Sequence, residues 1–276
     1  MKKSISAWAF APGRTAPQVF LLAREHGFEA VEVTIDEPGG GSCHQITTAS
    51  TRQECEQVRE QAARAGLSIA SMASGLGWKL RLSAPAQAER EQAIASTRDS
   101  LRRAAWLGAG ALLCVPGVVD QHAPYDLAHE NMRRSLLQLR DEAAELKVTL
   151  AIENVWNKML LSPLEMRALV DELSPAEGPG WLGVYFDVGN VLQTGYPEQW
   201  ISILGRRIAR VHLKDWKRSV GTIDGFCPLL EGDVDFPAVM HALRSAGYQG
   251  PLTSEFFNCE GELGQISRDM DEILAL

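Results

Sequence analysis

The sequence predicts a closed α/β barrel of the (β/α)8 type, built as a single domain over residues 1–276. Eight short apolar segments that resemble strands alternate with longer segments of helical periodicity, and no linker or low-complexity tract interrupts them. Four of the strand-like segments carry a carboxylate or a histidine at or near their carboxyl end, and barrels of this type place their chemistry at the carboxyl ends of the strands. An open doubly wound sheet is the weaker alternative, because no G-x-G-x-x-G loop follows the first strand.

The predicted strands are short and are bounded by turn residues. In chain order they are Ile5–Phe10, Ala30–Ile35, Ser68–Ser74, Ala111–Pro116, Thr149–Glu153, Leu182–Asp187, Ile208–His212 and Pro251–Phe257.

Helices are predicted between these strands from apolar positions three and four residues apart. The clearest are Thr51–Ala65, Ala86–Leu107 and Leu127–Leu146. Glycines that follow helical segments predict left-handed C-terminal caps at Gly27, Gly66 and Gly247. The pairs Ser162-Pro163 and Tyr196-Pro197 predict helix starts with proline in the first turn.

Composition narrows the class of protein. Hydrophobic residues make up 45% of the chain and charged residues 22%, as in ordinary globular proteins. The net charge of -8 argues against general binding to nucleic acid or to an anionic membrane. Five scattered cysteines without a C-x-x-C pair favour free thiols, and the N-terminus resembles neither a signal peptide nor a membrane span, so we expect a cytoplasmic protein.

Four successive predicted strands end on residues that bind metals. These are Glu153, Asp187, His212 and Glu255. If the strands are parallel neighbours, the four side chains converge at one rim and could hold one divalent cation of the Mn, Co, Zn or Mg type, with positions open to substrate. The sequence therefore predicts a metal centre at the carboxyl end of the barrel.

Such a centre suits chemistry on a keto-sugar. The metal would polarise the carbonyl of a ketose or a ketose phosphate and stabilise an enediolate. If Glu153 and Glu255 exchange protons on opposite faces of the substrate, the result is epimerisation. If one base returns the proton to the neighbouring carbon, the result is aldose–ketose isomerisation.

Further candidate residues lie beyond the strand ends, where they could bind a sugar or a phosphate. They are Trp156, Asn157 and Lys158 after the fifth strand, Asn190 after the sixth, and Lys214, Lys217 and Arg218 after the seventh. Late loops often bind phosphate in barrels, although a solvated basic loop is an equally simple interpretation of Lys217 and Arg218.

The sequence resembles the xylose-isomerase-like TIM barrels, the sugar phosphate isomerase/epimerase superfamily, over essentially its whole length. The four strand-end residues match the metal site of that superfamily. The stretches D-V-G-N (187–190), V-H-L-K-D (211–215) and E-G-D-V-D-F (231–236) are most similar to the L-xylulose- and L-ribulose-5-phosphate 3-epimerase branch, often labelled hexulose-6-phosphate isomerase. In that branch a glycine precedes E-G-D, and this chain has Leu230 there. The resemblance implies that Glu153 and Glu255 form the acid–base pair.

Other functions of the same barrel give alternatives. A dehydratase of an inosose type or a hydroxypyruvate-type isomerase would use the same metal and the same carboxylates. A phosphodiesterase for damaged DNA would need more histidines and a basic groove than this acidic chain offers. A sugar sensor without turnover is a further alternative. The expected partner is a small-molecule sugar or sugar phosphate, with no nucleic acid and no membrane, and self-association into a homo-oligomer is left open.

Overall fold

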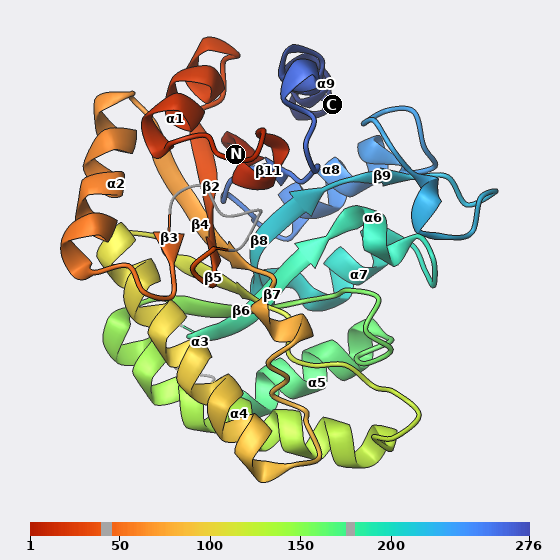
Figure 1. Cartoon of the computed structure of the whole chain (residues 1–276). Coiled ribbons are helices and arrows are strands. Elements are labelled where there is room, and N and C mark those ends of the chain that lie inside the picture. Colours follow the sequence, from red (N-terminus) through yellow and green to blue (C-terminus); the bar gives the residue numbers. More distant parts are fainter. Residues whose placement is uncertain (40–45, 175–179) are drawn as a thin grey trace.

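Eight parallel strands close into a barrel in the computed structural model, which describes residues 1–39, 46–174 and 180–276 (Figure 1). The barrel strands are β1 (Lys3–Ser6), β2 (Ala30–Asp36), β4 (Ser68–Ser74), β5 (Ala111–Cys114), β6 (Thr149–Glu153), β7 (Leu182–Asp187), β8 (Ile208–Leu213) and β11 (Leu252–Ser254). Each pairs in parallel with its neighbours, and β1 pairs with both β2 and β11, which closes the ring. The predicted fold class is confirmed.

Two additions extend this ring. A short strand, β3 (Ile46–Thr47), pairs in parallel with the end of β2. A small antiparallel hairpin of β9 (Asp215–Trp216) and β10 (Phe226–Cys227) follows β8. This hairpin belongs to the rim at which the barrel strands end.

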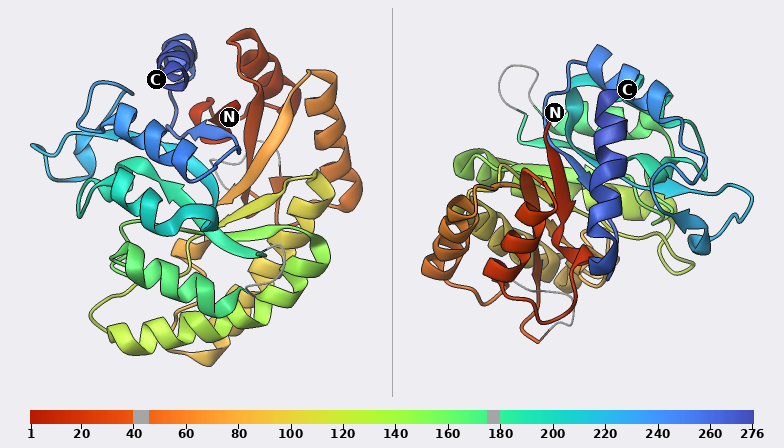
Figure 2. Two further views of the ribbon diagram at one scale, coloured as in Figure 1. Left: turned by 180° about the vertical axis from the view of Figure 1, so that it is seen from behind. Right: turned by 90° about the horizontal axis from the view of Figure 1, so that it is seen from above.

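Helices surround the barrel and cover the outer faces of the strands (Figure 2). They are α1 (Ala16–Glu25), α2 (Arg52–Arg64), α3 (Gln87–Leu107), α4 (Tyr125–Leu146), α5 (Pro163–Leu173), α6 (Val188–Val191), α7 (Pro197–Leu204), α8 (Phe236–Ser245) and α9 (Leu263–Ala275). Short 3-10 turns occur at η1 (Ala7–Ala9), η2 (Leu76–Trp78), η3 (Gly205–Arg207), η4 (Ile223–Gly225) and η5 (Glu260–Glu262). Over the described ranges, no helix combines the length and apolar character needed to cross a bilayer.

The predicted helix boundaries agree with the caps in the structure. Ser162 begins α5 as its N-cap, and its hydroxyl accepts a hydrogen bond from the Glu165 amide in a capping box. Gly27, Gly66 and Gly247 all have positive φ directly after α1, α2 and α8. Local sequence signals therefore set where these helices start and stop.

The first strand is the element whose predicted bounds differ most from the structure, and the predicted strands Ala111–Pro116 and Pro251–Phe257 also end earlier than expected, at Cys114 and Ser254. The apolar run Ile5–Phe10 suggested a strand, but β1 ends at Ser6 and the chain turns into η1. Phe10 and the alanines of η1 are fully buried, whereas Trp8 is partly buried and lines the cavity described below. Residues of one apolar run at the barrel rim can thus line the cavity as well as pack in the core.

Two separate packing regions follow from strand alternation. The large core lies between strands and helices and includes Ile5, Val31, Val33, Met72 and Phe186. A second, smaller cluster contains the alternate residues Ala73, Leu113, Val115, Ala151 and Tyr185, which point into the barrel. Polar side chains occupy much of the remaining interior, so the barrel lumen is the polar part of an otherwise apolar fold.

Candidate metal centre and active-site cavity

Four strand-end side chains meet at one rim of the barrel. Glu153 and Asp187 are the last residues of β6 and β7, His212 lies in β8 opposite Asp187, and Glu255 directly follows β11. One donor atom of each lies within 4.8 Å of the corresponding atoms of the others. The structure thus brings together the four residues that the sequence predicts as ligands.

The interatomic distances within the cluster suit a single small cation. His212 Nδ1 lies 2.8 Å from Glu255 Oε2, 3.8 Å from Glu153 Oε1 and 3.9 Å from Asp187 Oδ2. Asp187 Oδ2, His212 Nδ1 and Glu255 Oε2 are buried and make no hydrogen bond of good geometry, and their close polar neighbours are one another and the Lys214 ammonium. Buried polar atoms are normally paired, and carboxylate and imidazole donors at this spacing fit a divalent cation of the Mn, Co, Zn or Mg type.

Lys214 contributes the only ammonium group in the cluster among the described residues. Its Nζ lies 2.7 Å from Glu255 Oε2 and 3.1 Å from Asp187 Oδ2. The side chain also lies over the ring of Phe226, with Nζ 5.4 Å from the ring centroid. By strand alternation Lys214 shares the inner face with His212, so the prediction that it points toward the site agrees with its position.

A buried network beneath His212 was not foreseen from the sequence. Glu32 in β2 is fully buried, and its Oε1 lies 3.0 Å from His212 Nε2. Ser71 donates a hydrogen bond of 2.8 Å to Glu32 Oε2, and the Tyr185 hydroxyl donates to the same oxygen. The signal in the sequence was a lone glutamate at an inward position of the apolar strand Ala30–Ile35.

This network fixes the orientation of the histidine ring. An ionised carboxylate can only accept hydrogen bonds, so the Nε2 atom of His212 carries a hydrogen and Nδ1 faces the other three ligands. Burial acts to raise the pKa of Glu32, but the charge and hydrogen bond of His212 outweigh it, and the pKa is lowered. Glu32 therefore positions the imidazole ring of His212.

The two glutamates of the cluster have opposite tendencies to bind a proton. Burial raises the pKa of Glu153 to about 7. Burial also acts on Glu255, but the positive charges of Lys214 and His212 outweigh it and hold its pKa well below the usual range. A divalent cation would favour the ionised form of both carboxylates.

A large cavity opens above the cluster. It has a volume of about 900 Å³, and two of the four cluster residues, Glu153 and Glu255, line it. Asp187 and His212 lie behind them and are fully buried. The cavity also reaches Trp156, which stacks on Phe226 at 5.3 Å, and this arrangement offers an aromatic wall beside the glutamates.

The other predicted substrate-binding residues are spread over different environments. Asn190 lines the large cavity and donates a hydrogen bond to the Asn154 carbonyl. Asn157 is buried away from the cavity, where its amide bonds the Gly117 carbonyl. Lys158 lines a neighbouring cavity of about 250 Å³.

The basic loop after β8 lies at the edge of the large cavity. Lys217 and Arg218 are not among its lining residues. The guanidinium of Arg218 lies over the Tyr196 ring and bonds the Gly195 carbonyl, so it is directed toward the start of α7. The Lys217 amide bonds the Gly225 carbonyl and thereby closes the β9–β10 hairpin.

The Asp215 side chain holds the two motifs V-H-L-K-D and E-G-D-V-D-F together. Its carboxylate accepts hydrogen bonds from the backbone amides of Trp216, Gly232 and Val234. A Cβ at Gly232 would lie 2.1 Å from Asp215 Oδ1, so only glycine fits at this close approach. The contact joins the two motifs at the rim beside Lys214.

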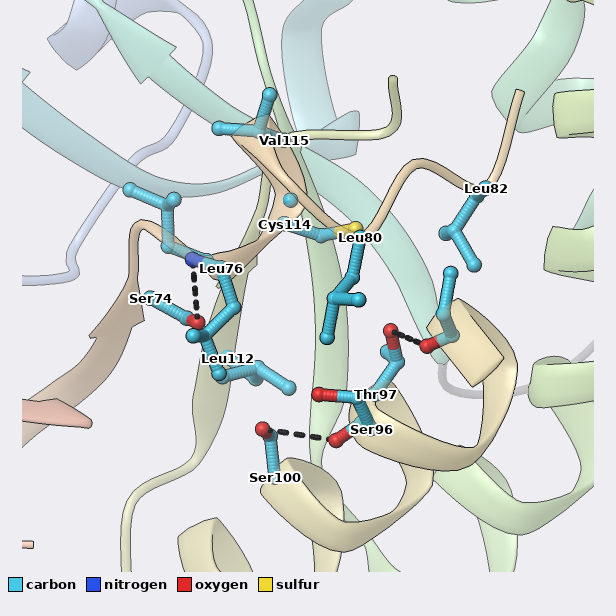
Figure 3. Close-up of a pocket in the computed structure, with 13 residues that line it drawn as sticks. Ser74, Leu76, Leu80, Leu82, Ser96, Thr97, Ser100, Leu112, Cys114 and Val115 are labelled. Carbon is cyan, nitrogen blue, oxygen red and sulfur yellow. Dashed lines mark hydrogen bonds between the residues drawn. The ribbon is translucent and has the colours of Figure 1, made fainter. Parts of the chain in front are cut away.

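A further, much smaller space lies between α3 and strands β4 and β5 (Figure 3). Its volume is about 20 Å³, which is room for about one water molecule. Ser100 and Thr97 bond carbonyls of their own helix, and Ser74 accepts from the Leu76 amide. The hydroxyls are thus already paired, and this space is a packing defect.

Comparisons with known proteins agree with the fold. The chain is 26% identical over 261 residues to a protein named "Putative L-ribulose-5-phosphate 3-epimerase SgbU" from Escherichia coli (strain K12), covering 90% of this chain and 86% of that protein. Among solved structures, a D-tagatose 3-epimerase-like protein superimposes with a TM-score of 0.81 at 19% identity, covering 100% of this chain and 97% of the other. A D-psicose 3-epimerase structure determined in the presence of D-fructose gives a TM-score of 0.77 at 17% identity, with coverage of 100% and 97%.

A sequence profile supplies the family assignment. The profile described as "Xylose isomerase-like TIM barrel" matches residues 20–275, which is nearly the whole chain. The match includes all four cluster residues and the two motifs held by Asp215. The protein belongs to the xylose isomerase-like TIM barrel family.

Proposed function

We propose that this protein is a metal-dependent epimerase or isomerase of a keto-sugar. The observation that carries the proposal is the buried cluster of Glu153, Asp187, His212 and Glu255 at the floor of a large cavity. The epimerase names of the relatives support the same class of reaction. The four cluster residues would hold the cation, and a bound cation would polarise the substrate carbonyl and stabilise negative charge on its oxygen.

The exposure of the cluster residues supports a division of roles among them. The two glutamates line the cavity, whereas Asp187 and His212 are fully buried, so only the glutamates can reach a carbon atom of the substrate. One carboxylate removes the proton from the carbon next to the carbonyl, and the C–H electron pair forms the enediolate of the substrate. The other glutamate, in its acid form, delivers a proton to the opposite face of that carbon. The product is the epimer.

The strand order favours epimerisation over isomerisation. β7 and β8 separate β6 from β11, so Glu153 and Glu255 enter the site from different sides of the rim. A substrate held between them presents one face to each. A single base that returns its proton to the neighbouring carbon would give an aldose, and elimination of water would give the product of a dehydratase.

Turnover in D₂O tests the proposal. A panel of ketoses, ketose phosphates and inososes with Mn²⁺, Co²⁺ or Zn²⁺ should include a ketose whose epimer forms with deuterium at C3. Deuterium at C1 or C2 of an aldose product would assign isomerisation, and loss of water from an inosose would assign the dehydratase. No exchange and no product with any compound would overturn the proposal.

Variants of the two glutamates test their roles. Glu153→Gln and Glu255→Gln should each reduce turnover by at least about 100-fold, the lower end of the usual contribution of a general acid or base. Glu145→Gln is the matched control, because Glu145 is exposed on α4 and far from the rim. Metal content must be measured for each variant, so that loss of a base is distinguished from loss of the cation.

A further inference from the structure

The large cavity has a greater volume than a single sugar would fill. Cavities that bury drug-sized ligands range from about 300 to about 1,000 Å³, and this cavity measures about 900 Å³. A free ketose is smaller than such ligands. If its carbonyl and adjacent hydroxyl lie near the two glutamates, most of the cavity remains open above it.

Aromatic side chains form much of the wall that remains. Trp8 and Phe257 stack with ring centroids 5.5 Å apart, and they follow the neighbouring strands β1 and β11. Trp156 and Phe226 form a second stacked pair after β6 and in β10. Phe257 lines the cavity and is 61% exposed, so the face of its ring is accessible to a ligand there.

The charge of the cavity is unfavourable for an anion. Among the described lining residues, Glu153, Asp215, Glu255 and Glu262 are acidic and Lys214 is the only cation. Lys214 is already held between Asp187 and Glu255. The four acidic lining residues and the buried Asp187 together carry five negative charges when ionised, against three positive charges from Lys214 and a divalent cation, so a phosphate dianion would meet net repulsion.

The two segments outside the described ranges bring no further lysine or arginine. Residues 40–45 and 175–179 contain no lysine or arginine. Of the cations that the sequence suggested for phosphate, Lys158 lines a separate cavity and Arg218 is engaged at the start of α7. Lys217 lies at the edge, on the hairpin that borders the cavity.

We propose that the substrate is an uncharged keto-sugar joined by a glycosidic bond to a second ring, and that this ring stacks on the Trp8–Phe257 pair. The proposal rests on the epimerase or isomerase function proposed above. It assigns the polar floor to the reacting sugar and the aromatic wall to the second ring. It also gives the acidic lining a role, because the lining discriminates against phosphorylated sugars of similar size.

A substrate series with the Mn²⁺-loaded protein tests this assignment. The probes are D-fructose, D-fructose 6-phosphate, the ketose disaccharides lactulose and isomaltulose, and phenyl 3-keto-β-D-glucoside. The readout is exchange of carbon-bound hydrogen with D₂O together with kcat/KM. At least one two-ring compound should exceed D-fructose by about 10-fold or more, since ring stacking and apolar burial add to binding. D-Fructose 6-phosphate should fall below D-fructose.

A pair of variants tests the aromatic wall. Phe257→Ala should lower kcat/KM for the preferred two-ring compound by about 10-fold or more while leaving D-fructose nearly unchanged. The control is Leu21→Ala, which removes a similarly exposed apolar side chain from α1, outside the cavity. An equal loss with both sugars would show that Phe257 supports the fold and would overturn its assignment to the second ring.

The outcomes separate this inference from the proposed function. Preference for D-fructose 6-phosphate, lost in Lys217→Ala, would overturn the neutral substrate and assign phosphate binding to the hairpin. Preference for free D-fructose over every two-ring compound would overturn the second ring. In both cases hydrogen exchange still supports an epimerase or isomerase. Absence of exchange with every probe would instead remove the function on which the inference rests.

Discussion

His212 Nε2 lies 3.0 Å from Glu32 Oε1 in the interior of the barrel, on the side of the imidazole ring away from the other three cluster residues. The contact joins β8 to β2, which lie on different parts of the ring. It leaves Nδ1 as the atom that faces the candidate cation. Glu32 therefore sets the tautomer and the angle of His212, and through them it would act on a cation bound by the cluster without touching it.

Removal of the Glu32 carboxylate should weaken metal binding. We expect Glu32→Ala to reduce the affinity for Mn²⁺ by about 10- to 100-fold, because His212 loses the acceptor that orients it. Glu32→Gln should have a smaller effect, since its amide oxygen can still accept from Nε2. Calorimetric titration with Mn²⁺ measures both. Ser71→Ala is the control, because it keeps the Glu32–His212 contact. Unchanged affinity in Glu32→Ala would contradict the positioning role.

The close approach at Gly232 predicts a loss of stability on adding a single methyl group. In Gly232→Ala the new Cβ would lie 2.1 Å from Asp215 Oδ1 and 2.7 Å from the Trp216 amide, so the hairpin must shift. We expect a decrease of about 1–3 kcal/mol in the free energy of unfolding. Urea denaturation measures it. Gly261→Ala is the matched control, because its Cβ would meet nothing within 4 Å, and an equal loss there would refute the explanation.

Replacement of Leu230 by glycine should increase the stability of the protein. Its φ of 67° lies in the left-handed region, and its side chain is 38% exposed, so little packing is lost on truncation. Leu230→Gly should raise the free energy of unfolding by on the order of 0.5–1 kcal/mol, after allowing for the greater freedom of glycine in the unfolded chain. Leu230→Ala keeps the strained backbone and should bring no gain. Thermal unfolding of the two variants side by side decides the question.

We expect the labelling of the two cavity thiols, Cys227 and Cys259, by an alkylating reagent to depend on pH. Burial raises the pKa of Cys227 to about 11 and that of Cys259 to about 12. The thiolate is the reactive form, so at pH 8 only about one Cys227 side chain in 1,000 is reactive, and labelling should accelerate as the pH rises toward 11.

Mass spectrometry after iodoacetamide treatment measures the labelling rate at each site. The experiment is best done in Cys43→Ser, because Cys43 lies outside the described residues. Cys55 and Cys114 are buried and serve as internal controls that should react only on unfolding. Labelling of Cys227 at pH 8 as fast as that of free cysteine would show that its thiol is not protected.

The sequence predicted the barrel because the signals for it are local. Strand and helix periodicity, the glycine caps and the proline starts each depend on a few neighbouring residues. The convergence of the four cluster residues was also predictable, because a strand that ends on Glu153 or Asp187 places that side chain at the common rim of a parallel barrel. In contrast, β1 was misplaced because an apolar run gives no sign of where the chain leaves the sheet to present Trp8.

The remaining features depend on residues that are distant in the sequence. The Glu32 network needs the register of four strands, so no spacing rule could connect Glu32, Ser71, Tyr185 and His212. The acidic lining is similar, because Asp215 and Glu262 come from different loops and only the fold places them around one cavity. Phosphate binding looked plausible from Lys217 and Arg218 as a pair, yet the guanidinium of Arg218 turns to Tyr196.

The pairing of β1 with β11 has a consequence for biosynthesis. β11 follows the other seven barrel strands in the chain, so during translation β1 and β8 each keep an unpaired edge until residues 252–254 leave the ribosome. Glu255 comes directly after β11. The candidate metal centre therefore receives its fourth residue, Glu255, in the same step that closes the barrel. A metal ion that binds to the nascent chain would then indicate that the barrel has closed.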